Sequence, residues 1–111
     1  MDEEIKIRLF DILQSINEIE SYFPEGAKNF EQYKKDTKTK RAVERDLEII
    51  GEAVSRILKK NLDCTLSNTQ KIIALRNRII HGYDTVSDEL IWAIIINHLP
   101  KLKTEIEAKL S

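Results

Sequence analysis

The sequence lacks most of the features that mark secreted, metal-binding or β-rich proteins. Cys64 is the only cysteine, which excludes an internal disulfide and a thiol-rich metal site built from one chain. Three glycines and two prolines are too few for the turns of a sandwich or barrel. No apolar run approaches the roughly 18 residues that span a bilayer, and the N-terminus, residues 1–4, is acidic where a secretion signal is basic. We therefore expect a cytoplasmic, all-α protein with no membrane segment.

An excess of charge of one sign is also missing, since 18 Lys and Arg face 19 Asp and Glu. A net charge of -1 argues against holding long nucleic acid through a global positive field. A local basic patch could still bind a short or structured RNA. A basic run that could contact RNA or a partner comprises Lys34, Lys35, Lys38, Lys40, Arg41 and Arg45, although such runs are more often solvated helix faces.

Hydrophobic residues make up 41% of the 111 residues, enough for one ordinary core, so we expect a single domain over residues 1–111. Apolar residues at helical spacing predict long helices at 3–22 and 37–62, with a shorter helix or turn at 29–36. A third long helix should run from a Ser67 or Asn68 cap to Gly82. A fourth should start at a Thr85–Asp88 capping box and kink at Pro100. The predicted fold is an antiparallel bundle of four long helices.

Two charged residues lie where the helical pattern expects apolar ones. Asp46 falls near the centre of the apolar arc of the 37–62 helix, and Arg76 near that of the next helix. A buried charge needs a partner, so we hypothesise an Asp46–Arg76 ion pair between these helices. In the alternative, each side chain reaches water at a helix edge.

A polar cluster at the end of the third helix could carry chemistry. Asn77 and His81 are four residues apart and so share a helix face, close to Arg76. Imidazole titrates near neutral pH and could move a 2'-hydroxyl proton, while a guanidinium stabilises charge on phosphoryl oxygens, and neither step needs a metal or cofactor. The same side chains could simply interact with the helix dipole.

The spacing of Arg76 and His81 raises a geometric problem. Five residues on a straight helix place the two side chains about 140° apart around its axis. Either the helix unwinds near Gly82, or a second subunit related by a two-fold axis completes the site. The spacing alone leaves both open.

The string from Arg76 to Tyr83, Arg-Asn-Arg-Ile-Ile-His-Gly-Tyr, resembles the R-x-x-x-x-H-x-Y motif of HEPN-domain ribonuclease toxins of the HepT type. The resemblance extends to residues 47–53, Leu-Glu-Ile-Ile-Gly-Glu-Ala, and to segments of the last helix at 91–92 and 99–103. It implies a HEPN-like homodimer whose Arg76 and His81 line a cleft where RNA is cut without metal. It also implies a minimal nucleotidyltransferase antitoxin as partner, which transfers AMP to Tyr83.

One segment departs from many relatives of this type: residues 66–70 read Leu-Ser-Asn-Thr-Gln where a Pro-Trp pair is common. This affects the expected loop before the third helix and not the motif. Two other interpretations remain. Tyr83 could be a half-buried ring that anchors the turn. The whole chain could be a non-catalytic helical binding module for a nucleotidyltransferase.

Overall fold

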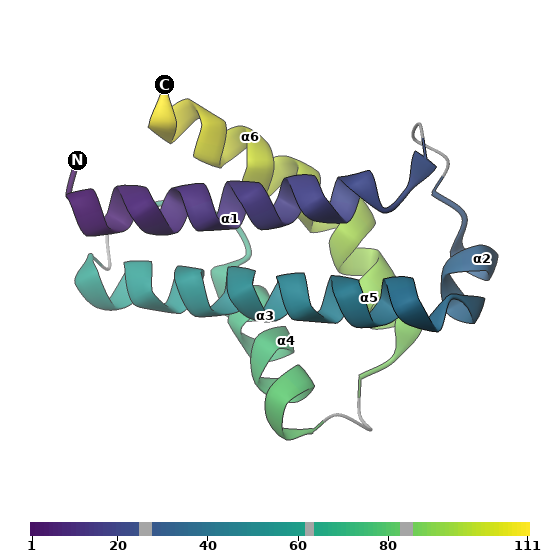
Figure 1. Cartoon of the computed structure of the whole chain (residues 1–111). Helices are drawn as coiled ribbons and strands as arrows, with labels where there is room; N and C mark the ends of the chain where they lie inside the picture. The colour runs from purple at the N-terminus through teal and green to yellow at the C-terminus, as the bar shows by residue number, and fades with distance from the viewer. Residues whose placement is uncertain (25–27, 62–63, 83–85) are drawn as a thin grey trace.

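A computed structural model describes residues 1–24, 28–61, 64–82 and 86–111, and every regular element in these ranges is helical (Figure 1). The elements are α1 (Glu3–Ser21), α2 (Phe30–Lys35), α3 (Thr37–Lys60), α4 (Thr69–His81), α5 (Asp88–Ala93), η3 (Ile94–His98) and α6 (Leu99–Leu110). The predicted all-α bundle, including the short helix before the second long one, is confirmed. In the same ranges no helix is long and apolar enough to cross a membrane.

The helix α3 is the centre of the fold, with α1 packed on one side and α4 on the other. Helices α1 and α3 run side by side in opposite directions, and α6 returns along α1 (Figure 1). Carboxylates fix where the two longest helices begin. Asp2 accepts hydrogen bonds from the backbone of Glu4 and Ile5 at 2.8 and 3.1 Å, and Asp36 accepts one from Thr39 at 3.0 Å.

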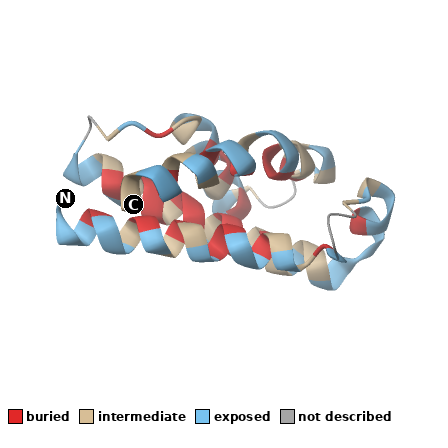
Figure 2. Cartoon of the chain, turned by 90° about the horizontal axis from the view of Figure 1, so that it is seen from above, coloured by how far each residue is buried: buried red, intermediate tan, exposed pale blue. Residues whose placement is uncertain are grey.

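The core lies between the helices, where the buried faces turn toward one another (Figure 2). The largest fully buried side chains are Leu9, Ile12, Ile16 and Ile19 of α1, Tyr33 of α2, Val43, Leu47, Ile50 and Ile57 of α3, and Ile91, Leu102 and Ile106 of α5 and α6. The apolar positions that the helical period selects are therefore the positions that fill the core.

The start of α4 differs from the predicted capping. Asn68 occupies the N-cap position in a left-handed conformation, with φ of 62°, and its side chain makes no capping hydrogen bond. The neighbouring Ser67 binds Glu105 of α6 instead, through its backbone N–H at 2.8 Å and through its hydroxyl. In this segment, which departs from the resembling family, Ser67 thus ties the start of α4 to α6.

The last helix is interrupted, as its proline predicted, although its start is different. Ser87 caps α5 by accepting a hydrogen bond from Leu90 at 3.1 Å, while the predicted cap, Thr85, lies outside the described residues. One π-helical turn, η3, precedes Pro100, which sits in the first turn of α6. Pro100 has no N–H and its ring would clash with the carbonyl four residues earlier, so a wider turn relieves the clash.

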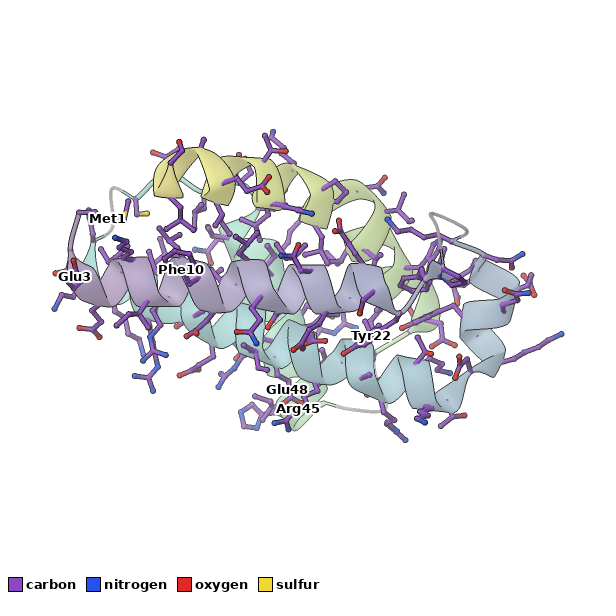
Figure 3. All side chains as sticks on the ribbon, turned by 45° about the horizontal axis from the view of Figure 1, so that its top comes forward. Met1, Glu3, Phe10, Tyr22, Arg45 and Glu48 are labelled. Carbon is purple, nitrogen blue, oxygen red and sulfur yellow. The ribbon has the colours of Figure 1, made fainter. Side chains whose placement is uncertain are left out.

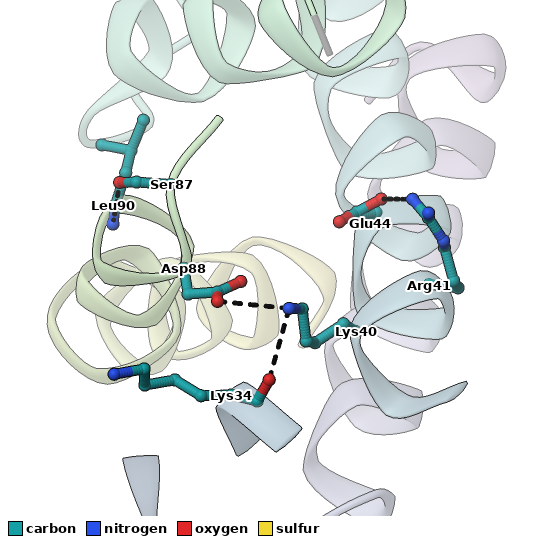
Figure 4. Close-up of polar contacts among 7 residues, drawn as sticks. All are labelled: Lys34, Lys40, Arg41, Glu44, Ser87, Asp88 and Leu90. Carbon is teal, nitrogen blue, oxygen red and sulfur yellow. Dashed lines mark hydrogen bonds and ion pairs between the residues drawn. The ribbon is translucent and has the colours of Figure 1, made fainter. Parts of the chain in front are cut away.

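The short helix α2 is held by aromatic packing and by one lysine. The indole of Trp92 lies 5.7 Å from the ring of Phe23, 5.5 Å from Phe30 and 5.2 Å from Tyr33, between ring centroids. Lys40 of the basic run binds Asp88 of α5 at 3.2 Å and the carbonyl of Lys34 at 3.4 Å (Figure 4). This lysine therefore joins three helices, whereas the sequence favoured a solvated face for the run.

Candidate functional site

Gly51 sets the position of Arg76, because the stem of Arg76 on α4 packs directly against this glycine of α3. A Cβ built on Gly51 would lie 2.3 Å from Cβ and 2.8 Å from Cγ of Arg76, and 3.4 Å from the carbonyl oxygen of Ile72. Carbon atoms in contact are normally about 3.5–4.0 Å apart. Only glycine lets the stem of Arg76 cross α3 at this distance.

Glu52, the next residue of α3, holds the guanidinium. The Nη2 of Arg76 lies 2.9 Å from Oε2 of Glu52, and Nη1 donates to Oδ1 of Asn77 at 3.1 Å. The other oxygen of Glu52 accepts from Nε of Arg56 at 2.8 Å. The hydrogen bond from Arg56, followed by the charge of Arg76, lowers the pKa of Glu52. Glu52 thus remains ionised and fixes the direction in which Arg76 points.

The predicted pair of Asp46 and Arg76 is wrong. Asp46 is buried, as expected, but it accepts a hydrogen bond from the hydroxyl of Tyr22 at 2.7 Å. Tyr22 lies at the end of α1 (Figure 3). Asp46 and Glu52 are six residues apart and so point about 120° apart around α3. One faces α1 and the other faces α4, so Arg76 meets Glu52 and not Asp46.

The carboxyl of Asp46 is in an unfavourable place for a charge. Burial raises its pKa to about 6, and Glu18 adds to the rise, while the hydrogen bond from Tyr22 opposes it. The same hydrogen bond is the main reason that the pKa of Tyr22 rises to about 12. Asp46 therefore belongs to the α1–α3 interface and does not support Arg76 directly.

His81 lies in the last turn of α4 and is exposed, as is Asn77 one turn earlier. The helix is regular through His81, so it does not unwind before this residue. The side chains of Arg76 and His81 consequently leave α4 about 140° apart. The structure brings Asn77 to Arg76, while Arg76 and His81 of one chain stay on different faces. Tyr83 lies outside the described residues.

Arg76 borders an open pocket of about 300 Å³ formed by α1, α3 and α4. The pocket is lined by Arg8, Asp11, Glu48, Ile49, Glu52, Ala53, Arg76 and Ile80. Its two isoleucines are unusually exposed for their type, 38% for Ile49 and 41% for Ile80. The Nε atoms of Arg8 and Arg76 are buried without a hydrogen-bond partner. The site on one chain is thus an arginine at the mouth of a charged pocket with apolar rims.

Sequence reasoning missed Gly51, Glu52 and Tyr22 as members of these clusters. A signal existed for the first, because a glycine in the middle of a long amphipathic helix indicates a close packing contact. Within the described part of the chain, no three His, Cys, Asp or Glu side chains group so as to hold a metal ion.

Comparison of the sequence with known proteins shows the family to which this chain belongs. The model of the family described as Ribonuclease HepT-like matches residues 12–108. A protein of Methanocaldococcus jannaschii with RNase in its name is 35% identical over 106 residues, which cover 95% of this chain and 86% of that protein. A Thermococcus cleftensis protein named "Probable ribonuclease HepT" is 34% identical over 109 residues, 96% of each chain. No solved structure gives a significant match. The chain belongs to the Ribonuclease HepT-like family.

Proposed function

We propose that this protein is a metal-independent endoribonuclease, the toxin of a toxin–antitoxin pair, with Arg76 and His81 as its catalytic residues. The observation that carries the proposal is the arginine held by Glu52 at the mouth of an open pocket, five residues before an exposed histidine. Membership in the Ribonuclease HepT-like family supports RNA as the substrate.

The chemistry assigns one role to each side chain. His81 accepts the proton of a ribose 2'-hydroxyl, and the 2'-oxygen attacks the adjacent phosphorus. The bond from phosphorus to the 5'-oxygen breaks and that oxygen takes a proton from water, leaving a 2',3'-cyclic phosphate and a 5'-hydroxyl end. Arg76 stabilises the charge that develops on the phosphoryl oxygens, and its fixed direction removes the need to reorganise during the step.

The complete site requires two chains in this proposal. Because α4 is regular through His81, one chain points Arg76 and His81 in different directions. A two-fold dimer packed on the exposed Ile49 and Ile80 would bury the apolar rims of the pocket and bring both copies of the motif toward one cleft. Formation of the homodimer would also bury the apolar surface that a single chain exposes at this face.

The partner in this proposal is a minimal nucleotidyltransferase antitoxin that transfers AMP to Tyr83. The modified residue would lie two positions beyond His81, so the added phosphate would place negative charge and bulk where the RNA phosphate binds. Tyr83→Phe should keep nuclease activity but resist modification by the purified partner, since only the phenolic oxygen accepts adenylate. Mass spectrometry of the intact protein measures this, and AMP found on Tyr83→Phe would reject the acceptor.

Cleavage of RNA by purified variants tests the catalytic assignment. His81→Ala and Arg76→Ala should each lower the cleavage rate by about 10²-fold or more while leaving the circular dichroism spectrum and the dimer unchanged. Lys103→Ala is the matched control, because Lys103 also forms an ion pair, 2.8 Å from Glu20, but contacts neither Glu52 nor the residues that line the pocket. It should keep the wild-type rate.

Two further measurements use the same preparations. Added EDTA should leave the rate unchanged, and the products should carry 2',3'-cyclic phosphate ends. Wild-type activity of folded His81→Ala would overturn the catalytic role of His81. Absence of cleavage by the purified wild-type protein would leave the non-catalytic binding module as the better description. Loss of activity on chelation would overturn metal independence.

A further inference from the structure

A second hollow lies on the other side of α4, between this helix and the α5–η3 segment. It has a volume of about 410 Å³ and is lined by Lys71, Ala74, Leu75 and Arg78 of α4 and by Leu90, Ala93, Ile94 and His98 across from them. We call it the α4–α5 groove. The four residues of α4 have i, i+3, i+4 and i+7 spacing and form one stripe of that helix about 10 Å long.

The groove is open because small residues face each other across it. Ala74 is exposed and Ala93 is half-buried, so neither fills the space between the helices. Helices α4 and α3 pack closely, whereas α4 and α5 do not. Leu75 and Ile94 form a buried floor, exposed by 3% each. The α4–α5 groove is therefore apolar and is bordered by two helices, a shape that a third helix could fill.

The π-helical turn brings a basic side chain, that of His98, to the α4–α5 groove. In an uninterrupted α-helix His98 would be rotated about 80° from Leu90, and Asn97 would lie closer to the same line. The wider turn of η3 removes much of that rotation, and His98 lines the groove while Asn97 does not. Of the lining residues that the structure describes, Lys71 and Arg78 are charged and none is a carboxylate.

We propose that the α4–α5 groove docks an acidic amphipathic helix of a partner protein. Apolar side chains of that helix would occupy the space beside Ala74 and Ala93, and carboxylates on its edges would face Lys71, Arg78 and His98. Charge complementarity favours an acidic occupant, because the ionisable side chains among the described residues of the lining are all basic.

The same lining disfavours the other occupants. Single-stranded RNA is held by stacking of its bases on aromatic rings, and none of the described residues that line the groove is aromatic. A second copy in a two-fold dimer is placed better on the exposed Ile80, which leaves α4 about 160° from Arg78. His81, three residues beyond Arg78, lies next along the helix surface, so the docked segment would be beside the candidate site.

A displayed library of random peptides, each about 15 residues long and so about four helical turns, tests the proposal on the full-length protein. Panning on the wild type should enrich peptides with apolar residues at i, i+3 or i+4 spacing flanked by Asp or Glu. Ala74→Trp fills the groove from an exposed position and should leave the circular dichroism spectrum unchanged. Fluorescence anisotropy of the most enriched peptide then measures its affinity for charge variants.

Lys71→Glu should weaken binding of this peptide by about tenfold or more. Lys59→Glu, at an exposed lysine of α3 outside the groove, should leave its affinity unchanged. Peptides with no acidic preference, or with equal affinity for Ala74→Trp, would overturn the proposal. Loss of the dimer in Ala74→Trp, measured by light scattering, would also overturn it and would assign the groove to a second copy. Displacement of the peptide by a single-stranded RNA oligonucleotide would overturn it as well. None of these readouts depends on nuclease activity.

Discussion

Gly51→Ala should destabilise this protein, although the same change in the middle of most helices stabilises the helix. On helix propensity alone, alanine is favoured over glycine by about 1 kcal/mol. Here the new Cβ would lie 2.3 Å from Cβ of Arg76 and 2.8 Å from its Cγ. Both atoms belong to the stem of the side chain, next to the backbone of α4, so they cannot move away without moving the helix.

The magnitude follows from the distance that α4 must move. To restore a normal carbon–carbon contact of about 3.5–4.0 Å, α4 must retreat from α3 by more than about 1 Å. Overpacking of this kind costs about 1–3 kcal/mol. After subtraction of the gain in propensity, we expect the free energy of unfolding to fall by up to about 2 kcal/mol. The displacement should also separate Arg76 from Glu52 and lower RNA cleavage by about 10²-fold.

Urea unfolding followed by circular dichroism measures the change, and Ser55→Ala, one turn further along α3, is the control for helix propensity. The control should shift the free energy of unfolding by about 0.5 kcal/mol or less. If Gly51→Ala instead proves more stable than the wild type by the propensity difference, and cleaves RNA at the wild-type rate, the close contact does not position Arg76.

Three other changes test separate parts of the structure. Burial raises the pKa of Asp46 from its ordinary value of 3.8 to about 6, so the folded protein binds this proton more tightly than the unfolded chain does. The contribution of Asp46 to stability therefore falls as the pH rises from about 4 to 6. Asp46→Asn should remove that part of the pH dependence, a relative gain of about 2 kcal/mol at pH 7 after allowance for screening, measured by urea unfolding across this range. Glu52→Gln should lower the cleavage rate by about tenfold, because Arg76 loses the carboxylate that orients it. The free energy of unfolding should change by less than about 1 kcal/mol, since the side chain of Glu52 is 38% exposed. A cleavage rate equal to that of the wild type would show that Glu52 does not position Arg76. Trp92→Ala should destabilise by about 3 kcal/mol in thermal unfolding, since the indole packs on three other rings, and an unchanged melting temperature would contradict that packing.

Helical periodicity in the sequence was enough to predict most of the core and roughly where each long helix lies, although Ile80, also at an apolar position of its helix, is 41% exposed. It correctly predicted that Asp46 is buried and that the stem of Arg76 faces another helix. Both conclusions depend only on the angle of a residue around its own helix axis, which spacing along the chain determines. The interruption before Pro100 was predictable for a similar reason, because the missing N–H and the ring clash are local.

The partners of these residues could not be predicted in the same way. Whether Arg76 meets Asp46 or Glu52 depends on which side of α3 is covered by α1 and which by α4. The close contact at Gly51 depends on how far α4 is shifted along α3 before the two helices cross. Spacing along one helix gives angles around that helix alone, whereas the contact between two helices is decided by their relative rotation, offset and crossing angle. These quantities are set by how the whole core packs.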